Sequence, residues 1–304
     1  MTKTLRAHIA LFLVNTFYGA SHILAKGVMP FYLTPNVFIL FRALGATFLF
    51  WIVKLFFVNE KIEKKDYFRL IACGLFGVTI NQLFFFHGLN LSSSINSGII
   101  MTINPILVVI LSFFVLKEKI TIQKVIGIGL GATGAILLTL AGGTSKGDSM
   151  LGDFFLFINA ASYAIYLVIA KPLMQKYKPL TVITYTFTFG AIFILCFPPT
   201  LPELFATNFS ALTTSIIVKI VYVVIGVTFL TYLLTMYGLK YLSPAISSSY
   251  IYLQPVLVML FAVLFSALGV ADDYTNTITF NKIIYMMLIF TGVYIISMKR
   301  KQTI

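Results

Sequence analysis

The chain has 304 residues, of which 59% are hydrophobic and only 10% are charged, and its mean hydropathy is +0.98. Soluble globular domains contain about 45–50% apolar and about 25% charged residues, so this composition excludes a water-soluble fold and predicts a membrane protein. The formal net charge of +13 does not indicate nucleic-acid binding, because the basic residues interrupt apolar runs instead of gathering on one polar face. Cys73 and Cys196 both lie inside apolar runs, which indicates small buried side chains and neither a disulfide nor a metal site.

Ten apolar runs follow one another along the chain. A helix needs about 20 apolar residues to cross the hydrocarbon core of a bilayer. Runs of this kind, bounded by charged residues, Gly, Pro or Asn, predict an all-α membrane protein with ten transmembrane helices. They lie near residues 7–25, 37–57, 67–90, 93–115, 122–141, 152–171, 180–198, 214–238, 244–268 and 281–298.

The first run has a second interpretation, a secretory signal, because Lys3 and Arg6 precede its apolar core and small residues follow it. An internal match argues against cleavage. The segment 18–26, which ends in Ala-Lys, aligns with the segment 163–171, which also begins with Tyr and ends in Ala-Lys. We therefore expect the first run to remain as a transmembrane helix.

Basic residues are concentrated in alternate connections, the asymmetry that orients a membrane protein during insertion. This pattern predicts a multi-pass protein of the bacterial inner membrane with both termini in the cytoplasm. One side carries Lys3, Arg6, Lys61, Lys64, Lys65, Arg69, Lys117, Lys119, Lys124, Lys171, Lys176, Lys178, Lys240, Lys299, Arg300 and Lys301; the other carries only Lys26, Lys146, Lys219 and Lys282.

A longer internal repeat pairs residues 86–110 with residues 236–260 without a gap. It aligns Asn104 with another amide, Gln254, directly before a proline in each copy. The other informative pairs are Gly88 with Gly238, Ser93 with Ser243, Ser97 with Ser247 and Pro105 with Pro255. The sequence thus predicts two related five-helix units, residues 1–146 and 147–304. Because five spans end on the opposite side of the membrane from where they begin, the second unit is expected to be inverted, with a site where the units meet near the bilayer midplane.

The chain resembles the drug/metabolite transporter superfamily, specifically its EamA-like ten-span transporters, over nearly its whole length. The residues that carry the resemblance are the segment from Tyr18-Gly19 to Lys26, Arg42, the run from Gly88-Leu89 through Pro105 to Lys117-Glu118-Lys119-Ile120-Thr121, and the glycine-rich segment 127–134. The resemblance implies two inverted five-helix repeats around a central cavity, lined mainly by spans one, three, four, six, eight and nine. It further implies a secondary transporter, with export the expected direction.

One short loop departs from the family pattern. The family often repeats the Glu of the first unit, here Glu118, after span nine, where this chain has Ser266-Ala-Leu-Gly-Val-Ala-Asp-Asp-Tyr274. Either Asp272 and Asp273 substitute for that Glu or the turn is longer. Glu118 itself is expected to be a structural loop residue.

Polar residues inside the apolar runs repeat at helical spacing and predict faces turned to the bundle interior, because an unpaired polar group in lipid costs several kcal/mol. The alternative is that these small and amide side chains only hold helices together. The candidate substrate-binding residues are Asn15, Tyr18, His22, Arg42, Asn81, His87, Ser97, Asn104, Asn159, Tyr163, Tyr166, Ser247, Tyr250 and Gln254, and the candidate hinges are Pro105 and Pro255.

The positions of the charged residues limit which substrates and coupling ions are expected. All nine acidic residues fall in predicted loops or at span ends, so no carboxylate anchors a cation at mid-membrane. Arg42 is expected either to face the cavity, where it would bind a carboxylate or phosphate or close an outer gate, or to reach the surface. His22 and His87 remain as groups for proton coupling. Lys54 and Lys171, near the predicted cytoplasmic ends, are expected to extend to the membrane surface.

The sequence lacks the motifs of other function classes. No His-Glu-x-x-His sequence or pair of intramembrane acids indicates a protease, and no Gly-Lys-Ser/Thr follows the segment 127–134, so neither an enzyme nor a cofactor is expected. Those glycines predict close helix packing, within the chain or against a second copy, which leaves monomer and homodimer open. A scaffold without transport activity stays as the rival of another class.

The expected partners are membrane lipid, a small-molecule substrate and, if transport is coupled, protons. Tyr, amide and Arg side chains suit an amino-acid-like or other amphipathic neutral, zwitterionic or anionic metabolite. A multidrug or organic-cation exporter is the alternative within the superfamily.

Overall fold

The computed structural model describes residues 1–24, 32–92, 97, 100–141, 149–267 and 279–298. Every regular element in these ranges is a helix, which agrees with the all-α prediction. The principal helices are α1 (Lys3–Leu24), α2 (Pro35–Phe57), α3 (Tyr67–Gly74), α4 (Asn81–Leu91), α6 (Asn104–Leu116), α7 (Ile122–Leu140), α8 (Met150–Lys176), α9 (Pro179–Cys196), α10 (Thr200–Ala206), α11 (Thr214–Tyr222), α12 (Thr231–Tyr241), α13 (Pro244–Ser249), α14 (Gln254–Ala267) and α15 (Phe280–Ser297). Shorter segments are η1 (Lys64–Asp66), η2 (Leu75–Ile80), η3 (Phe209–Ala211), η4 (Val223–Leu230) and η5 (Tyr250–Leu253).

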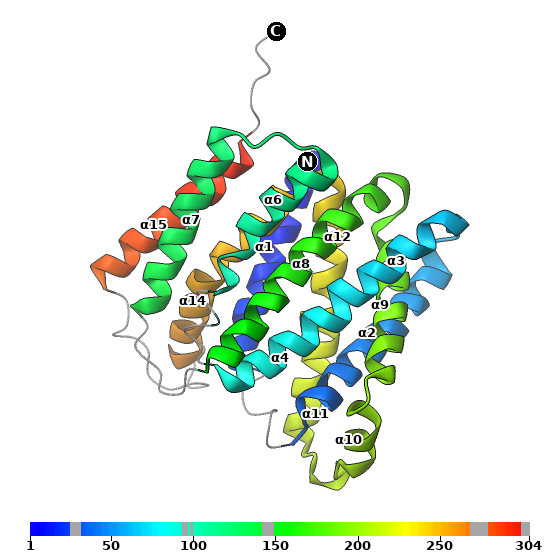
Figure 1. Ribbon diagram of the computed structural model, residues 1–304. Coiled ribbons are helices and arrows are strands. Elements are labelled where there is room, and N and C mark those ends of the chain that lie inside the picture. The colour runs from blue at the N-terminus through cyan, green and yellow to red at the C-terminus, as the bar shows by residue number, and fades with distance from the viewer. Residues whose placement is uncertain (25–31, 93–96, 98–99, 142–148, 268–278, 299–304) are drawn as a thin grey trace.

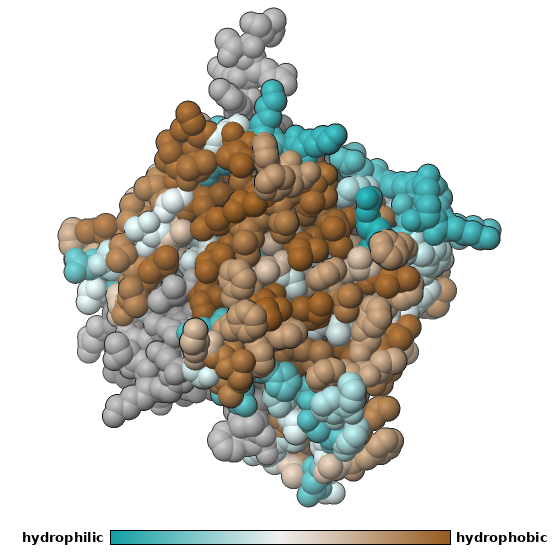
Figure 2. Space-filling view, viewed as in Figure 1, coloured by the Kyte–Doolittle hydropathy of each residue, from teal (hydrophilic) through white to brown (hydrophobic). Residues whose placement is uncertain are grey.

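Eight helical stretches in the described ranges are long and apolar enough to cross a membrane. The 13-residue α6 is apolar but shorter, and α1 is not among the eight. Apolar side chains cover the surface over α7, α15, α8 and α4, whereas polar ones gather near the start of α3 and around α10 (Figure 2). The eight stretches are Pro35–Phe57, Lys64–Leu91, Ile122–Leu140, Met150–Lys176, Pro179–Cys196, Thr214–Tyr241, Pro244–Phe261 and Phe280–Ser297.

The helices form one bundle in which early and late parts of the chain alternate. Helix α1 packs against α12 and α14, and α8 packs against α4 and α6. Helices α7 and α15 lie side by side at one edge of the bundle, and α2 and α9 lie together at the other (Figure 1). Helix α1 begins and α15 ends at the same end of the bundle (Figure 1).

Two π-helical segments interrupt long helices at corresponding places. Segment η2 joins α3 to α4, and η4 joins α11 to α12. In each, a threonine near the end donates to the carbonyl five residues earlier: Thr79 Oγ1 to Gly74 O at 3.3 Å and Thr228 Oγ1 to Val223 O at 2.8 Å. The hydroxyl satisfies a carbonyl that the widened turn leaves without its usual amide partner.

Glycines permit the closest helix contacts. A Cβ on Gly77 would lie 2.5 Å from the ring of Tyr166, so only glycine lets that tyrosine pack on η2. Gly127, Gly131 and Gly134 of α7 face α15 and Tyr252 at comparably short range. The close packing predicted for segment 127–134 therefore occurs inside this chain, and these three glycines are not available to a second copy.

Of the two lysines that were expected to extend to the membrane surface, Lys54 is buried and Lys171 is partly buried. Lys54 is buried, with Nζ 5.3 Å from the ring centre of Trp51 and 5.7 Å from that of Tyr185. Lys171 Nζ donates to the carbonyls of Leu239 and Leu242, both at 2.7 Å, and so satisfies the C-terminal end of α12. The prediction was wrong for Lys54, because it ignored the aromatic rings that can hold an ammonium group.

An ion-pair cluster joins the loop before α3 to the end of α8. Lys176 Nζ lies 2.6 Å from both Glu63 Oε1 and Asp66 Oδ2, and the hydroxyl of Tyr177 donates to Asp66 Oδ2 at 2.6 Å. Hydrogen bonds from Lys176 and Lys65 lower the pKa of the Glu63 carboxyl below its ordinary value. Both carboxylates are thus held ionised beside the lysine.

Candidate functional site

The centre of the bundle contains a pair of amides that bind across two helices. Asn159 Nδ2 of α8 donates to the carbonyl of Asn81 at 2.6 Å, and Asn81 Nδ2 of α4 donates to the carbonyl of Asn159 at 3.4 Å. The hydroxyl of Tyr232, from α12, donates to Gly77 O at 3.2 Å and approaches Asn81 Oδ1 at 3.5 Å. Three helices therefore meet at one polar point.

Asn104 extends this polar group along α8. Its Nδ2 donates to the carbonyl of Ala160 at 2.8 Å, whereas its Oδ1, although buried, has no hydrogen-bond partner among the described residues. The hydroxyl of Ser247 is likewise buried without a partner there. Buried polar atoms are normally paired, so these two atoms are available to a solute or water.

Two tyrosines of α8 follow Asn159, at four and seven residues along the helix. The rings of Tyr163 and Tyr166 are 5.8 Å apart. Tyr166 is fully buried against Gly77, and its hydroxyl donates to Met236 Sδ at 3.3 Å. Tyr163 is only partly buried. Tyr166 is accordingly a core residue, and Tyr163 is the better candidate for contact with a solute.

Arg42 lies inside the protein and not at its surface. The residue is 7% exposed, its Nε donates to Thr228 Oγ1 of η4 at 3.1 Å, and its guanidinium carbon stands 4.9 Å from the ring centre of Phe86. No carboxylate of the described residues lies within ion-pair distance. The guanidinium therefore lies beside aromatic rings without a carboxylate partner in the described part of the chain, an arrangement suited to an incoming anion.

The turn that joins η4 to α12 contacts helix α1. Thr231 Oγ1 donates to Val227 O at 2.6 Å and approaches the hydroxyl of Tyr18 at 3.4 Å. Asn15, three residues earlier in α1, is buried but donates to Leu11 O of its own helix at 2.8 Å. Tyr18 therefore contacts the turn that follows Thr228, the hydrogen-bond partner of Arg42. The side-chain amide of Asn15, in contrast, bonds within α1.

His87 belongs to a hydrogen-bonded chain at the end of the bundle where α2 begins. Its Nε2 lies 3.0 Å from Asn36 Oδ1, and Asn36 Nδ2 donates to Glu203 Oε1 at 2.9 Å. The hydroxyl of Thr34 donates to Glu203 Oε2 at 2.5 Å. Because the amide nitrogen of Asn36 is used on Glu203, its oxygen accepts from His87, which fixes a proton on Nε2. A pocket of about 310 Å³ opens beside Thr34 and Glu203.

Four predicted binding residues, Tyr250, Ser97, Gln254 and His22, remain to be located relative to the polar contacts described above. Tyr250 lies near the start of α1, where its hydroxyl is 2.7 Å from His8 Nδ1. Ser97 is buried, and Gln254, the first residue of α14, is partly buried. The side chain of His22 lies outside the described residues.

The two candidate hinges occupy the same place in their helices. Pro105 is the second residue of α6, after a turn, and Pro255 is the second residue of α14, after the 3₁₀ segment η5. Each proline therefore starts a new helix, a position that requires no lost hydrogen bond.

Sequence reasoning missed Thr228, Thr231, Tyr232, Asn36 and Glu203. A signal existed for two of them, since the offset that pairs segment 86–110 with 236–260 also sets Thr231 and Tyr232 opposite Asn81 and Gln82.

Among the described residues, no three His, Cys, Asp or Glu side chains gather in a way that would hold a metal ion.

Known proteins resemble this chain over nearly its full length. The model of the EamA-like transporter family matches residues 5–140 and again residues 150–298. An uncharacterized transporter of Archaeoglobus fulgidus is 27% identical over 292 residues, covering 96% of this chain and 99% of that protein. The uncharacterized transporter YetK of Bacillus subtilis is 25% identical over 307 residues, covering 99% and 89%. A solved structure, described only as the crystal structure of a protein, has the same fold, with a TM-score of 0.70, 18% identity and coverage of 96% and 95%.

Proposed function

Because the chain belongs to the EamA-like transporter family, it is a membrane transporter and not an enzyme, and we propose that it exports small metabolites by alternating access. The proposed solutes are amino-acid-like or other amphipathic neutral, zwitterionic or anionic molecules. The observation that carries this choice is Arg42, a buried cation with aromatic neighbours and no carboxylate partner among the described residues.

We further propose ten spans arranged as two inverted repeats, residues 1–146 and 147–304. Reciprocal contacts support this division. Helix α1 packs on α12 while α8 packs on α4, and the π-helical segments η2 and η4 lie at matching places. Tyr252 Oη donates to the carbonyl of Thr102 at 3.2 Å, a contact between residues at equivalent positions in the two units. Such contacts are expected along the symmetry axis of an inverted repeat.

The proposed transport route passes between these units. The polar groups proposed to line it are His87 with Asn36, Arg42 with Thr228, and the amide pair of Asn81 and Asn159. We propose that Pro105 and Pro255, at the starts of α6 and α14, allow the adjoining segments to change angle as the route opens on alternate sides.

The proposed location is the bacterial inner membrane with both termini in the cytoplasm. The common end of α1 and α15 supports placing both termini on one side (Figure 1), and the excess of basic residues there supports the cytoplasmic side.

Counterflow in liposomes tests the proposed substrate class. The purified chain is reconstituted, loaded with unlabelled solute and offered labelled neutral amino acids, a monocarboxylate or the organic cation tetraphenylphosphonium. We expect saturable counterflow of a zwitterion or anion, strongly reduced in Arg42→Gln. The matched control is Arg69→Gln, which makes the same chemical change at an exposed position.

Two results would contradict the proposal. Transport of the cation alone, unchanged in Arg42→Gln, would favour a multidrug exporter. Counterflow no faster than in empty liposomes for every solute would favour a protein without transport activity.

A further inference from the structure

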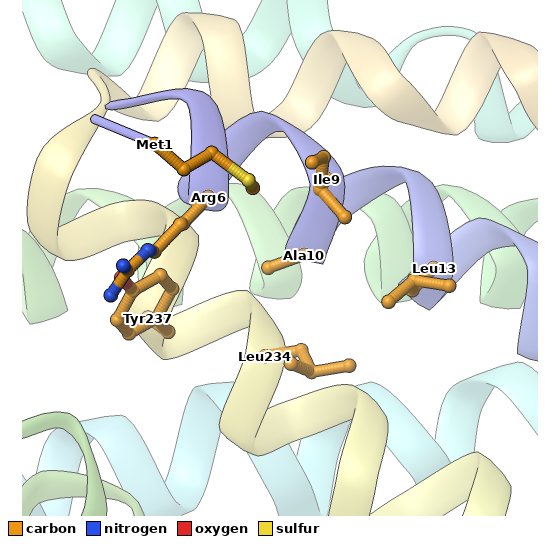
Figure 3. Close-up of a pocket in the computed structure, with 7 residues that line it drawn as sticks. All are labelled: Met1, Arg6, Ile9, Ala10, Leu13, Leu234 and Tyr237. Carbon is orange, nitrogen blue, oxygen red and sulfur yellow. The ribbon is translucent and has the colours of Figure 1, made fainter. Parts of the chain in front are cut away.

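Helices α1 and α12 leave a groove of about 310 Å³ between them on the outside of the bundle. Ala10 and the side chains of Ile9, Leu13 and Leu234 line its length, and Arg6 and Tyr237 lie together at one end (Figure 3). None of these residues takes part in the polar groups assigned to transport. The groove is therefore a separate feature of the protein surface.

The length of the groove is apolar and faces away from the protein core. Ile9 and Leu13 are 41% and 40% exposed, whereas Ala10 between them is 4% exposed and provides the floor. The neighbouring Leu5 and Phe12 of α1 are also exposed. In a membrane protein these side chains meet hydrocarbon, so an extended acyl chain fits the chemistry of the groove.

The end of the groove is cationic. Arg6 is exposed, and no carboxylate of the described residues lies within ion-pair distance of it. Arg6 lies in the first turns of α1, three residues after Lys3. The proposed cytoplasmic N-terminus places this end of α1 at the membrane surface. A guanidinium there is placed to bind a phosphate with two parallel hydrogen bonds, and the Tyr237 hydroxyl is a second donor at the same end.

From this combination we propose that the groove binds one anionic phospholipid. Its acyl chain lies along Ile9, Leu13 and Leu234, and its headgroup phosphate binds Arg6. Basic residues beside apolar clefts between membrane helices recognise anionic headgroups in this way. The proposal requires the membrane location and the described groove, but it does not depend on which solute the protein carries.

Native mass spectrometry of the full-length protein in detergent tests the site. Phosphatidylglycerol and phosphatidylcholine with identical acyl chains are added in turn, and glycerol 3-phosphate alone serves as the headgroup control. We expect one phosphatidylglycerol to be retained in preference to phosphatidylcholine. Arg6→Gln should weaken that retention about tenfold or more, the change that corresponds to the loss of a hydrogen bond to a charged group, about 1.5–3 kcal/mol.

Two further variants separate the groove from general surface charge. Lys3→Gln removes a charge from the same end of α1 without altering the groove lining, and it should leave retention unchanged. Ile9→Trp places a larger ring on an exposed wall and should weaken binding of both lipids. Equal losses in Lys3→Gln and Arg6→Gln, or equal retention of both lipids by the unaltered protein, would overturn the proposal.

Fluorescence gives an independent measurement in a bilayer. The chain has one tryptophan, so Leu13→Trp in a Trp51→Phe background places a single reporter in the groove. Phosphatidylglycerol with dibrominated chains should quench it more than the matching phosphatidylcholine, and Arg6→Gln should remove the difference. Equal quenching, or a dimer in the mass spectra that Ile9→Trp dissociates, would show that bulk lipid or a second copy covers the groove instead.

Discussion

Asn81 and Asn159 bind each other's backbone: each side-chain amide donates to the main-chain carbonyl of the other residue, at 3.4 and 2.6 Å. The pair joins α4 to α8 at the level where Tyr232 of α12 also donates. Each amide uses a donor on the opposite helix, so the pair can hold the two helices together in hydrocarbon while remaining polar enough to meet a solute.

Replacing Asn159 by Ala should destabilise the protein. The change removes the shorter of the two bonds, and interhelical hydrogen bonds in membrane proteins contribute about 0.6–1.7 kcal/mol. The thermal unfolding midpoint in detergent measures the loss. Asn15→Ala is the matched control, because the amide of Asn15 is equally buried but bonds only within α1. Equal shifts in the two variants would mean that the contact between α4 and α8 contributes nothing specific.

Both Arg42→Lys and Arg42→Gln should impair transport. Lys keeps the charge but loses the Nε bond to Thr228 and the planar group over Phe86, whereas Gln loses the charge itself. A hydrogen bond to a charged group contributes about 1.5–3 kcal/mol, so kcat/KM should fall about ten- to a hundredfold. Thr228→Val, which removes the acceptor for Arg42 and the bond to Val223 O but keeps the guanidinium, should have a smaller effect. Full activity of both Arg42 variants in the liposome assay would exclude a direct role.

Gly77→Ala should disrupt folding, whereas Gly129→Ala should be tolerated. The added methyl group on Gly77 would lie 2.5 Å from the ring of Tyr166, but the one on Gly129 would meet nothing within 4 Å. Overpacking of a core costs about 1–3 kcal/mol, and Ala in place of Gly in a helix gains up to about 1 kcal/mol. The yield of monodisperse protein and its unfolding midpoint should therefore move in opposite directions in the two variants.

The sequence predicted the helical class, the family and many of the polar positions, because apolar runs and repeated motifs are local properties. On a continuous α-helix, Ser243, Ser247, Tyr250 and Gln254 would lie on one face, because they follow one another at intervals of three and four residues. The structure differs because Tyr250–Leu253 is a 3₁₀ segment, in which each residue advances about 120° instead of about 100°. Tyr250 therefore meets His8, and Tyr252 reaches Thr102.

The π-helical segments could not be predicted for a related reason. An extra residue in the turn is stabilised by tertiary contacts, such as the bond from Thr79 to Gly190 O at 3.1 Å and that from Arg42 to Thr228. Neither partner is near in sequence. Glu203 was expected in a loop or at a span end; it lies in the short helix α10, and its contacts with Thr34 and Asn36 depend on how α10 returns to α2.

The ion-pair cluster at the end of α8 should make stability depend on acidic pH. The Glu63 pKa is lowered in the folded protein, so the stabilisation is fully present above the ordinary Glu pKa of about 4.3 and is lost as pH falls through the lower folded value. The difference in unfolding midpoint between the unaltered protein and Lys176→Gln should be constant near neutral pH and shrink below about pH 4. Lys178→Gln, which breaks none of these ion pairs, should show no such change. A pH-independent difference for Lys176→Gln would contradict the assignment.

His87→Gln should separate solute movement from proton coupling. Glutamine can still donate to Asn36 Oδ1, so the chain to Glu203 is kept, but it cannot titrate. If protons are the coupling ion and His87 carries them, the variant should keep counterflow and lose stimulation by a pH gradient. The control is His8→Gln. His8 lies near the start of α1 beside Tyr250, away from the chain that contains His87, so this variant should keep the stimulation. Labelled solute uptake with and without an imposed gradient measures both properties in one preparation. Stimulation of His87→Gln equal to that of the unaltered protein would show that His87 holds α4 to α2 without carrying the proton.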